Sequence, residues 1–502
     1  MKCLVTAVVV VVFSACSAAA VLAEPAPGGA ASVPAVRTGL AQKPEVADAI
    51  QLLESWVESQ MAYRGIPGLS LGIVHDQELV WARGYGYADV EKKTPATPAT
   101  LYRIASNSKL FTSVAVLQLR DAGKLGLDDP VEKHLTWFAL RNRQPGEAPV
   151  TIRSLLTHTG GLPREAAFPY WADLRFPTRK QIEETVPGQE RVFPPYTKWK
   201  YSNLGLTLAG EIVEAASGEP YADYVRRHIF EPLGMSGSSV GVPDTLRSRL
   251  ATGYGRRLPD GTRSVRPFSD LAGLDPAGGL TSSVEDLAKF ASLQFRDGPE
   301  GGAQILAGAT LREMQRVHWI SPDWKGAWGL GFEIVRQEDR TLVGHGGWVA
   351  GYQTSFITWP QGKIAVIALT NADDGQPYPG SPFSVVDRFF KWVTPALKNA
   401  AEPAPRKGDR RPEWEAYVGQ YRSPWGDSQI MILADRLTLV SLLDVDPSTT
   451  KLTLVEVAPH TFRTESNAPF VEDGDIVAFD LDPQGKATRM RFGGDRMDRV
   501  AP

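Results

Sequence analysis

Strand-like segments at both ends of a long helical stretch constrain the fold of this chain more than any other feature of its sequence. Two apolar runs near the start, joined by a turn at Asp76-Gln77, are expected to form strands. The middle, about 100–320, is mainly helical with loops rich in Pro and Gly. Strands are expected at 69–74, 79–85, 329–336, 340–344, 352–359 and 364–371, and further helices near 45–63 and 383–393. This order predicts one antiparallel sheet, built from both ends of the chain, with helices packed on it.

A serine and a lysine three residues apart open the first helix of the middle segment. Ser106 and Lys109 lie at positions i and i+3 on one helix face, where the lysine amine can stand beside the serine hydroxyl. A serine hydroxyl is a poor nucleophile without a neighbouring base. The N–H groups at a helix N-terminus also favour negative charge that develops next to the serine. The pair indicates acyl transfer to Ser106, whereas a helix cap would be the better interpretation of Ser106 taken alone.

Three other matches to catalytic patterns are interpreted as accidental or structural. Ser448 and Lys451 repeat the Ser-x-x-Lys spacing, but the residues after them alternate like a strand. The stretch Gly237–Gly241 matches Gly-x-Ser-x-Gly, but no strand leads into it, as a nucleophile elbow requires. His158 begins a His-x-Gly match at the end of a short helical stretch, and we assign this histidine a structural role.

Two further motifs follow Ser106 and Lys109 along the chain. Tyr201-Ser202-Asn203 is the only Tyr-x-Asn in the sequence and sits on a loop just before a helix. His345-Gly346-Gly347 lies between two strand-like segments, where a glycine lets a substrate backbone approach a sheet edge closely. A purely structural protein gives no reason for the three motifs to occur together, so the sequence favours an enzyme.

In this order, Ser-x-x-Lys, Tyr-x-Asn and His-x-Gly resemble the motifs of the serine β-lactamase and penicillin-binding-protein superfamily. The pattern is most similar to the branch of class C β-lactamases, D-stereospecific peptidases and β-lactamase-like carboxylesterases. Two sequence segments that are typical of this branch are also present, Leu155–Leu162 and Pro232–Met235. The resemblance covers about residues 45–393. It implies an α+β fold, with an antiparallel sheet flanked by helices and a mainly helical middle.

The resemblance implies a role for each motif residue. Ser106 is the expected nucleophile, and Lys109 and Tyr201 share the role of general base, with the choice between them left open. Asn203 is expected to hydrogen-bond both the lysine and the substrate amide. The backbone N–H groups of Ser106 and Trp348 are expected to form an oxyanion hole.

His345, Gly347 and Trp348 are expected to line the substrate site, and His345 is counted with the catalytic residues. Most true β-lactamases of this type have a lysine where this chain has His345. A lysine always offers a cation to a substrate carboxylate, whereas a histidine with a pKa near ~6.5 does so only part of the time. This departure disfavours efficient β-lactam hydrolysis. Trp348 adds an apolar wall, which favours an ester or an aromatic substrate.

The sequence therefore predicts a serine hydrolase that forms an acyl-enzyme on Ser106 and acts on D-amino-acid-containing peptides or amides, or on esters. Two alternatives stay open: a β-lactamase of class C type, and a non-enzymatic sensor of β-lactams or cell-wall fragments that is acylated without turnover. The expected partner is a small-molecule or short-peptide substrate. A formal net charge of −3 gives no basic field for nucleic acid. The oligomeric state is left open.

The N-terminus has the pattern of a secretory signal. Lys2 precedes an apolar run, and Val21-Leu22-Ala23 fits a cleavage site, so residues 1–23 are predicted to be a signal peptide of a periplasmic or secreted protein. The alternatives are a lipoprotein attached to the membrane through Cys16 and an uncleaved anchor. Cys3 and Cys16 are the only cysteines, so the exported protein is expected to have no disulfide. The histidines show no paired spacing, and we predict no metal and no cofactor.

Composition divides the rest of the chain. Residues 24–44, rich in Pro, Ala and Gly, are predicted to be a flexible tether, and 394–412 a linker after the hydrolase domain at 45–393. From 413 to 502 the sequence changes to short alternating strands and predicts a small antiparallel β-barrel or sandwich. The position of this domain resembles that of the lipocalin-like C-terminal domain of some D-peptidase relatives. Its strands are expected at 429–432, 437–440, 451–457 and 476–481.

Overall fold

The computed structural model describes residues 35–142, 145–337, 340–401, 410–441, 450–466 and 473–500. The chain divides into two compact units, the first ending at Ala400 and the second beginning at Ala401. The predicted signal peptide and Cys16 lie outside the described residues. Within the ranges given, no helix is both long enough and apolar enough to span a membrane.

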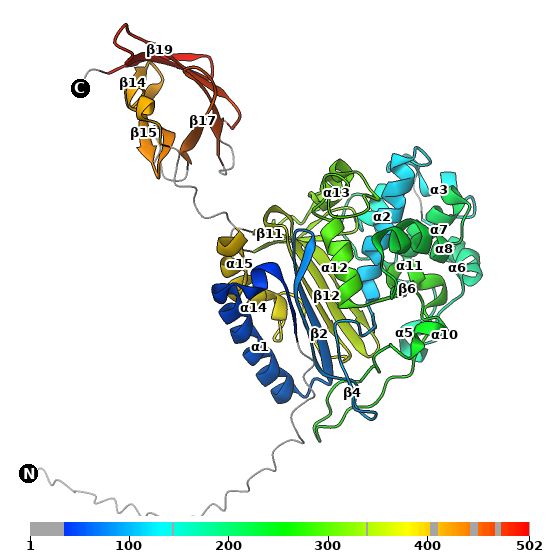
Figure 1. Ribbon diagram of the computed structural model, residues 1–502. Helices are drawn as coiled ribbons and strands as arrows, with labels where there is room; N and C mark the ends of the chain where they lie inside the picture. The colour runs from blue at the N-terminus through cyan, green and yellow to red at the C-terminus, as the bar shows by residue number, and fades with distance from the viewer. Residues whose placement is uncertain are drawn as a thin grey trace, which may run out of the picture. The chain divides into compact units, whose positions relative to one another are not determined.

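The first unit is built on an antiparallel sheet whose strands come from both ends of the unit (Figure 1). β2 (Gly68–His75) pairs with β13 (Ile364–Thr370), so Leu69 lies opposite Thr370. The strand order is β1-β3-β2-β13-β12-β11-β10-β9-β8, with β4 paired to β3 outside this path. The remaining strands are β1 (Val36–Arg37), β3 (Glu78–Asp89), β4 (Thr94–Pro95), β8 (Trp319–Ile320), β9 (Ala327–Trp328), β10 (Glu333–Gln337), β11 (Arg340–Val349) and β12 (Tyr352–Trp359). The predicted sheet is confirmed.

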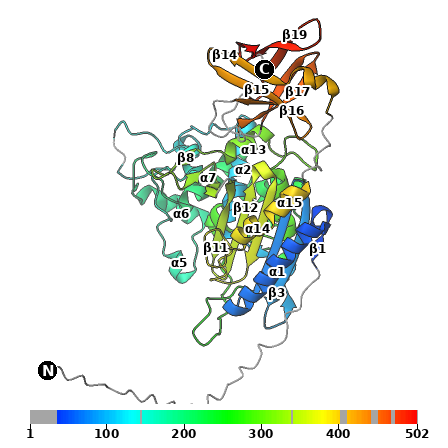
Figure 2. The same ribbon diagram turned by 90° about the vertical axis from the view of Figure 1, so that its left-hand side faces the viewer.

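Helices cover both faces of the sheet, and the side chains of β13 show why. Alternate residues of a strand point to opposite faces. Val366 and Ala368 belong to the core beneath α1 (Pro44–Arg64) and α14 (Val385–Trp392), which lie over the sheet in Figure 2. Ile367 and Leu369 belong to the larger core on the other face, which includes α12 (Val284–Leu293). A strand buried on both faces accounts for the continuous apolar run that the sequence shows there.

The middle of the chain forms the helical layer that the sequence predicts. Its longest helices are α2 (Ser108–Asp121) and α7 (Asn203–Ser217), both buried along most of their length. The other helices are α3 (Val131–His134), α4 (Ile152–Leu156), α5 (Tyr170–Asp173), α6 (Arg179–Thr185), α8 (Tyr221–Val225), α9 (Glu231–Leu233), α10 (Asp244–Arg247), α11 (Asp275–Gly278) and α13 (Gly308–Gln315). A small sheet of order β5-β7-β6 also lies here, with β5 at Tyr102–Arg103, β6 at Ser239–Val240 and β7 at Leu280–Ser282.

Two predicted flexible segments are partly ordered. The predicted tether reaches residue 44. Within it, however, β1 pairs with β3, and Ala41 of the 3-10 helix η1 (Gly39–Gln42) has a buried side chain. The linker was expected from residue 394, but Thr394–Ala401 forms α15, whose Leu397 is fully buried in the core with α14. Proline favours a first helical turn as well as a loop, and composition alone does not separate these roles.

The second unit is a closed barrel of eight antiparallel strands, which confirms the predicted barrel. Its interior holds Tyr421, Phe462 and Met490, all fully buried. Four of the eight strands are not predicted from the sequence, because charged residues such as Arg489 and Arg491 interrupt their apolar alternation. The strands are β14 (Gly419–Ser423), β15 (Gly426–Leu433), β16 (Arg436–Ser441), β17 (Leu452–Ala458), β18 (Thr461–Glu465), β19 (Ile476–Leu481), β20 (Ala487–Phe492) and β21 (Asp495–Arg499).

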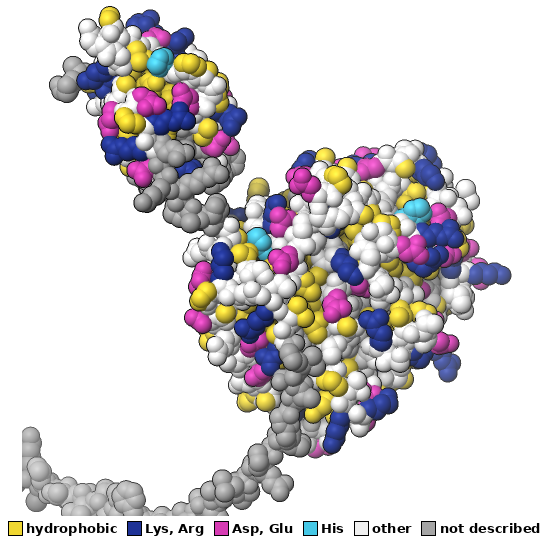
Figure 3. All heavy atoms as spheres, in the orientation of Figure 1, with side chains coloured by type: hydrophobic (Ala, Val, Ile, Leu, Met, Phe, Trp, Pro, Cys, Tyr) yellow, Lys and Arg dark blue, Asp and Glu magenta, His cyan; other side chains and the backbone are white. Residues whose placement is uncertain are grey.

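On the face shown in Figure 3, acidic and basic side chains are interspersed over both units. No large area of one sign gathers on this face. This pattern agrees with the small formal net charge of −3.

Candidate active site

Ser106 lies in a tight turn that leads directly into α2. The turn is the 3-10 helix η2 (Ala105–Asn107), and Ala105 has a φ of +50°, in the left-handed region that costs an alanine free energy. Lys109, in the first turn of α2, donates a hydrogen bond from Nζ to Ser106 Oγ at 3.1 Å. A second hydrogen bond joins Lys109 Nζ to the carbonyl oxygen of Ala277 at 2.6 Å. The structure thus brings the predicted nucleophile and base into contact.

Lys109 is fully buried, and this burial lowers the pKa of its amine to about 7. Glu165 opposes the change by stabilising the ammonium, and Arg164 adds to it by repulsion. A lysine with this pKa is partly neutral near pH 7. It can therefore accept the proton of Ser106, which an ordinary lysine with a pKa near ~10.4 rarely could.

Tyr201 packs its ring against two cations. Lys109 Nζ and the guanidinium carbon of Arg164 each lie 5.0 Å from the centre of the Tyr201 ring. Burial raises the pKa of the Tyr201 hydroxyl, although Ser106 and Arg164 act in the opposite direction. The phenol is therefore protonated near neutral pH. Between the two candidate bases, the structure favours Lys109.

His158 supports the loop of Tyr201. Its ring centre lies 4.5 Å from that of Tyr201, and its Nδ1 accepts a hydrogen bond from the backbone N–H of Ser202 at 3.2 Å. Burial, and repulsion by Lys109, hold the pKa of His158 well below its ordinary value, so the ring is neutral. These contacts agree with the structural role that the sequence suggested.

The rate is expected to depend on pH through Lys109. Because its pKa is lowered to about 7, the neutral form that can act as a base predominates above that pH. We expect kcat/KM to increase as the pH rises through about 7 and then to level off. A pH–rate profile of an ester substrate that is stable over this range measures the effect. A rate that keeps rising to pH 10 and beyond would instead indicate the Tyr201 phenolate as the base.

Asn203 bonds to a carboxylate that the sequence analysis did not consider. Its Nδ2 donates to Glu165 Oε1 at 2.8 Å, and Tyr170 also donates to Glu165 through its hydroxyl. The expected hydrogen bond between Asn203 and Lys109 is absent from the described structure, where the lysine amine donates to Ser106 Oγ and to the Ala277 carbonyl. Glu165 acts on Lys109 only through its charge. In the sequence, the one indication that Glu165 belongs to the site is its position just after the Leu155–Leu162 segment.

His345 is inside strand β11 and carries no charge at neutral pH. Burial and the nearby Lys109 lower its pKa to about 3. The sequence suggested a histidine that is cationic part of the time, and this expectation is wrong because the ring is 5% exposed and Trp328 packs edge-on against it at 5.6 Å. His345 can accept or donate a hydrogen bond as a neutral imidazole, but it offers no cation to a substrate carboxylate.

Gly347 lets β11 approach the loop that carries Ser106. A Cβ at this position would lie 2.3 Å from the carbonyl oxygen of Ile104, closer than any real contact. That oxygen accepts a hydrogen bond from Thr354 Oγ1 at 3.0 Å, and Asn107 Nδ2 donates to the same Thr354 oxygen at 2.9 Å. Only glycine fits here, and the fit ties the strand of Trp348 to the turn of Ser106.

A cavity of about 800 Å³ opens over these residues and is of a size that suits a small-molecule substrate. Five predicted site residues line it: Ser106, Tyr201, His345, Gly347 and Trp348. Its walls include the aromatic side chains of Trp199, Tyr201, Trp328, Trp348 and Tyr378, and its charged side chains include Glu333 and Arg164. Asn203 instead lines a hollow of about 50 Å³ that also reaches Ser106 and Trp348. In the described part of the chain, no group of three or more His, Cys, Asp or Glu side chains could hold a metal ion.

A serine hydrogen-bonded to a buried lysine beside a tyrosine, on a sheet flanked by helices, defines the class as serine hydrolases of the β-lactamase and transpeptidase type. The family model described as Beta-lactamase matches residues 53–384. The chain belongs to the Beta-lactamase family. This confirms the resemblance drawn from the three motifs.

Several known proteins are similar to this chain. Beta-lactamase-like protein 2 of Dictyostelium discoideum is 30% identical over 331 residues, which are 64% of this chain and 59% of that protein. The octameric penicillin-binding protein homologue from Pyrococcus abyssi has a TM-score of 0.59 and 28% identity, covering 89% of this chain and 99% of that one. A D-amino acid amidase from Ochrobactrum anthropi SV3, solved with L-phenylalanine amide, has a TM-score of 0.58 and 29% identity, covering 71% and 99%.

Proposed function

We propose that this protein is an exported serine hydrolase that forms an acyl-enzyme on Ser106 and cleaves D-amino-acid amides or peptides, or esters. The observation that carries the proposal is the 3.1 Å hydrogen bond between Ser106 Oγ and Lys109, whose pKa is lowered to about 7. The similarity to a D-amino acid amidase supports the amide class. Export rests on the signal pattern of residues 1–23.

The proposed reaction uses Lys109 twice. Neutral Lys109 takes the Ser106 proton while Oγ forms a bond to the substrate carbonyl carbon, and the backbone N–H groups of Ser106 and Trp348 hold the oxyanion. The C–N or C–O bond to the leaving group then breaks, and the leaving group receives the proton from Lys109, directly or through the Tyr201 hydroxyl. Water attacks the acyl-enzyme in the second half, with Lys109 again accepting a proton and Ser106 recovering its own.

The electrostatics of the cavity favour an amide or ester over a β-lactam. Neutral His345 gives a substrate carboxylate no cation at the position where most true β-lactamases have a lysine. Trp348 is 56% exposed and offers an apolar surface. The class C β-lactamase is therefore the less favoured activity, although Arg164 lines the same cavity and carries a positive charge.

Intact-protein mass spectrometry with product analysis tests the proposal. Purified protein is mixed separately with a p-nitrophenyl ester, D-phenylalanine amide, L-phenylalanine amide and a penicillin. We expect turnover of the ester or of the D-amide, with the L-amide cleaved more slowly, and a transient mass increase equal to the acyl group. A stable penicillin adduct with no turnover of any substrate would favour the sensor instead. Rapid penicillin hydrolysis would favour the β-lactamase.

A further inference from the structure

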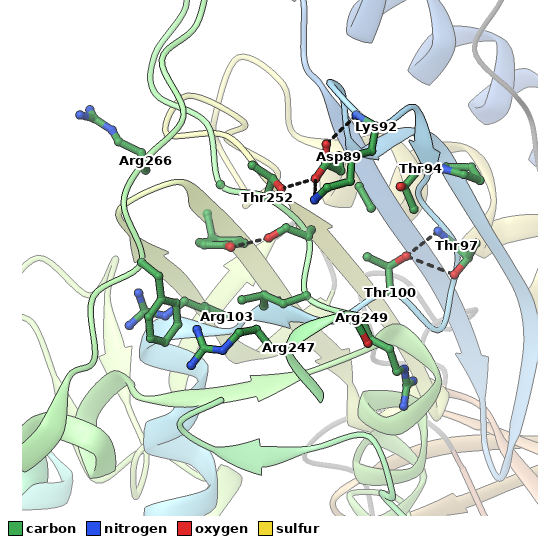
Figure 4. A pocket seen from close by; sticks show the side chains of 18 of the residues that line it. Asp89, Lys92, Thr94, Thr97, Thr100, Arg103, Arg247, Arg249, Thr252 and Arg266 are labelled. Atoms are coloured by element: carbon green, nitrogen blue, oxygen red, sulfur yellow. Dashed lines mark hydrogen bonds and ion pairs between the residues drawn. The ribbon is translucent and has the colours of Figure 1, made fainter. Parts of the chain in front are cut away.

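A second cavity of about 590 Å³ lies in the first unit and shares no lining residue with the hollows at Ser106 (Figure 4). Its walls come from segments far apart in the sequence: residues between Ala88 and Arg103, the stretch 247–253, residues 266–268, and the turn between β11 and β12. Five cationic side chains line it, and Asp89 is its only acidic lining residue. The five are Lys92, Arg103, Arg247, Arg249 and Arg266.

Arg103 is the unusual member of this group because it is 3% exposed. An arginine stays charged in a protein, and a buried charge costs free energy unless a partner compensates it. Its guanidinium donates a hydrogen bond to the hydroxyl of Ser269 at 3.5 Å, which is long and weak. No carboxylate of the described residues lies within ion-pair distance of Arg103. Asp275 and Asp270 act on it only through space, and the burial that raises the pKa of Asp275 to about 7 leaves that carboxyl partly protonated.

Arg247 lies against the same aromatic ring as Arg103. The guanidinium carbons of Arg103 and Arg247 lie 5.1 and 5.0 Å from the ring centre of Phe268. Figure 4 shows the two side chains directed to the same side of the cavity. Two cations on one aromatic ring repel each other, so a shared counter-anion would stabilise both. The one ion pair of Arg247, with Asp244 at 3.3 Å, is at the exposed surface and is worth little.

The other cations of the cavity already have partners. Lys92 pairs with Asp89 at 2.8 Å, and Arg266 pairs with Asp373 at 2.7 Å. Arg249 donates to the carbonyl oxygen of Ala99 at 3.0 Å, and Figure 4 shows its side chain directed away from Arg103. Among the cations that the described residues place in the cavity, Arg103 has no carboxylate partner and Arg247 has only its exposed pair with Asp244, so these two are the best placed to receive a ligand.

We propose that this cavity binds a small organic anion, with a phosphate or carboxylate group held by Arg103 and Arg247. Arginine forks match the oxygens of either group in a bidentate geometry. The volume exceeds what one inorganic ion needs and is typical of sites for small organic molecules. Threonine side chains at positions 94, 97, 100 and 252, together with Leu250 and Ala251, provide a mixed polar and apolar wall for the rest of the ligand. The site is independent of the proposed hydrolase activity.

Isothermal titration calorimetry of the full chain tests the site with four probes: phenyl phosphate, benzoate, inorganic phosphate and neutral benzyl alcohol. We expect saturable 1:1 binding of phenyl phosphate or benzoate, whichever group the natural ligand carries, and at least about tenfold weaker binding of the other two. Arg247→Gln should weaken the binding at least about tenfold, because a hydrogen bond to a charged group is lost. Arg247 is half-exposed, so the variant is expected to fold.

Arg226→Gln is the matched control, since Arg226 has a similar exposure and a similar i,i+3 pair with an aspartate, outside the cavity. Its affinity should equal that of the unmodified protein. Equal weakening by the two substitutions would overturn the proposal. So would loss of binding in Arg164→Gln but not in Arg247→Gln, which would place the anion in the cavity at Ser106. Inorganic phosphate that binds as tightly as phenyl phosphate would overturn an organic ligand.

Discussion

Replacement of Ser106 by alanine is expected to lower kcat/KM for the preferred ester or amide by at least about 10³-fold while the protein stays folded. The substitution removes the Oγ atom that forms the acyl bond in the proposed mechanism. Lys109 keeps its hydrogen bond to the Ala277 carbonyl, so its buried amine retains a partner. Steady-state kinetics, with mass spectrometry for the acyl adduct and thermal unfolding for stability, measure the three effects.

Ser113→Ala is the matched control for this substitution. Ser113 lies on α2, the helix that begins two residues after Ser106. It is fully buried, and its hydroxyl has no hydrogen-bond partner in the described structure. Removing that hydroxyl should leave both kcat/KM and the acyl adduct unchanged. Turnover by Ser106→Ala at more than a tenth of the original rate, once contamination is excluded, would remove Ser106 from the mechanism.

Replacement of Lys109 by methionine is expected to lower kcat/KM by at least about 10²-fold. Methionine has a similar length and is apolar, so it fills the fully buried position without a base. The loss of general-base catalysis typically costs about 10²–10⁴ in rate. Stability changes for two opposing reasons. The Ala277 carbonyl loses its donor, at a cost of about 1–3 kcal/mol, whereas the cost of burying an amine disappears.

The substitutions Lys109→Arg and Tyr201→Phe show which of the two residues acts as the general base. Arginine keeps a positive charge but cannot accept a proton at neutral pH, so Lys109→Arg should be as inactive as the methionine variant. Tyr201→Phe keeps the ring that packs against Lys109 and removes only the hydroxyl. Its rate should fall, but the rise in kcat/KM with an apparent pKa of about 7 should persist. Activity that survives in Lys109→Met and vanishes in Tyr201→Phe would make Tyr201 the base.

The parts of the fold that follow from short-range patterns could be predicted well. Ser106 and Lys109 are three residues apart on a helical start, and one turn of helix is enough to place them in contact. The apolar runs of β2 and β13 predicted strands, and the order of strands and helices predicted their common sheet. Tyr201 and Gly347 could be assigned to the site only through the resemblance, because nothing local connects them to Ser106.

Charges and partners could not be predicted, because they depend on burial by distant segments. The sequence predicted that His345 is charged part of the time, but burial in the fold lowers the pKa of its ring to about 3. It predicted a hydrogen bond between Asn203 and Lys109. In the fold, Asn203 donates to Glu165 and the lysine donates to the Ala277 carbonyl. It contained no sign that Arg103 would be buried without a carboxylate.

The sequence by itself determined the sheet with its helical middle, the C-terminal barrel and the pairing of Ser106 with Lys109. These features rest on periodicity and on spacings of a few residues, which a chain carries locally. Only the tertiary structure decided which base is poised near neutral pH, that His345 is neutral, and that Arg103 and Arg247 both lie against the ring of Phe268. A pKa and an ion's partners are set by desolvation and by neighbours that folding brings from elsewhere in the chain.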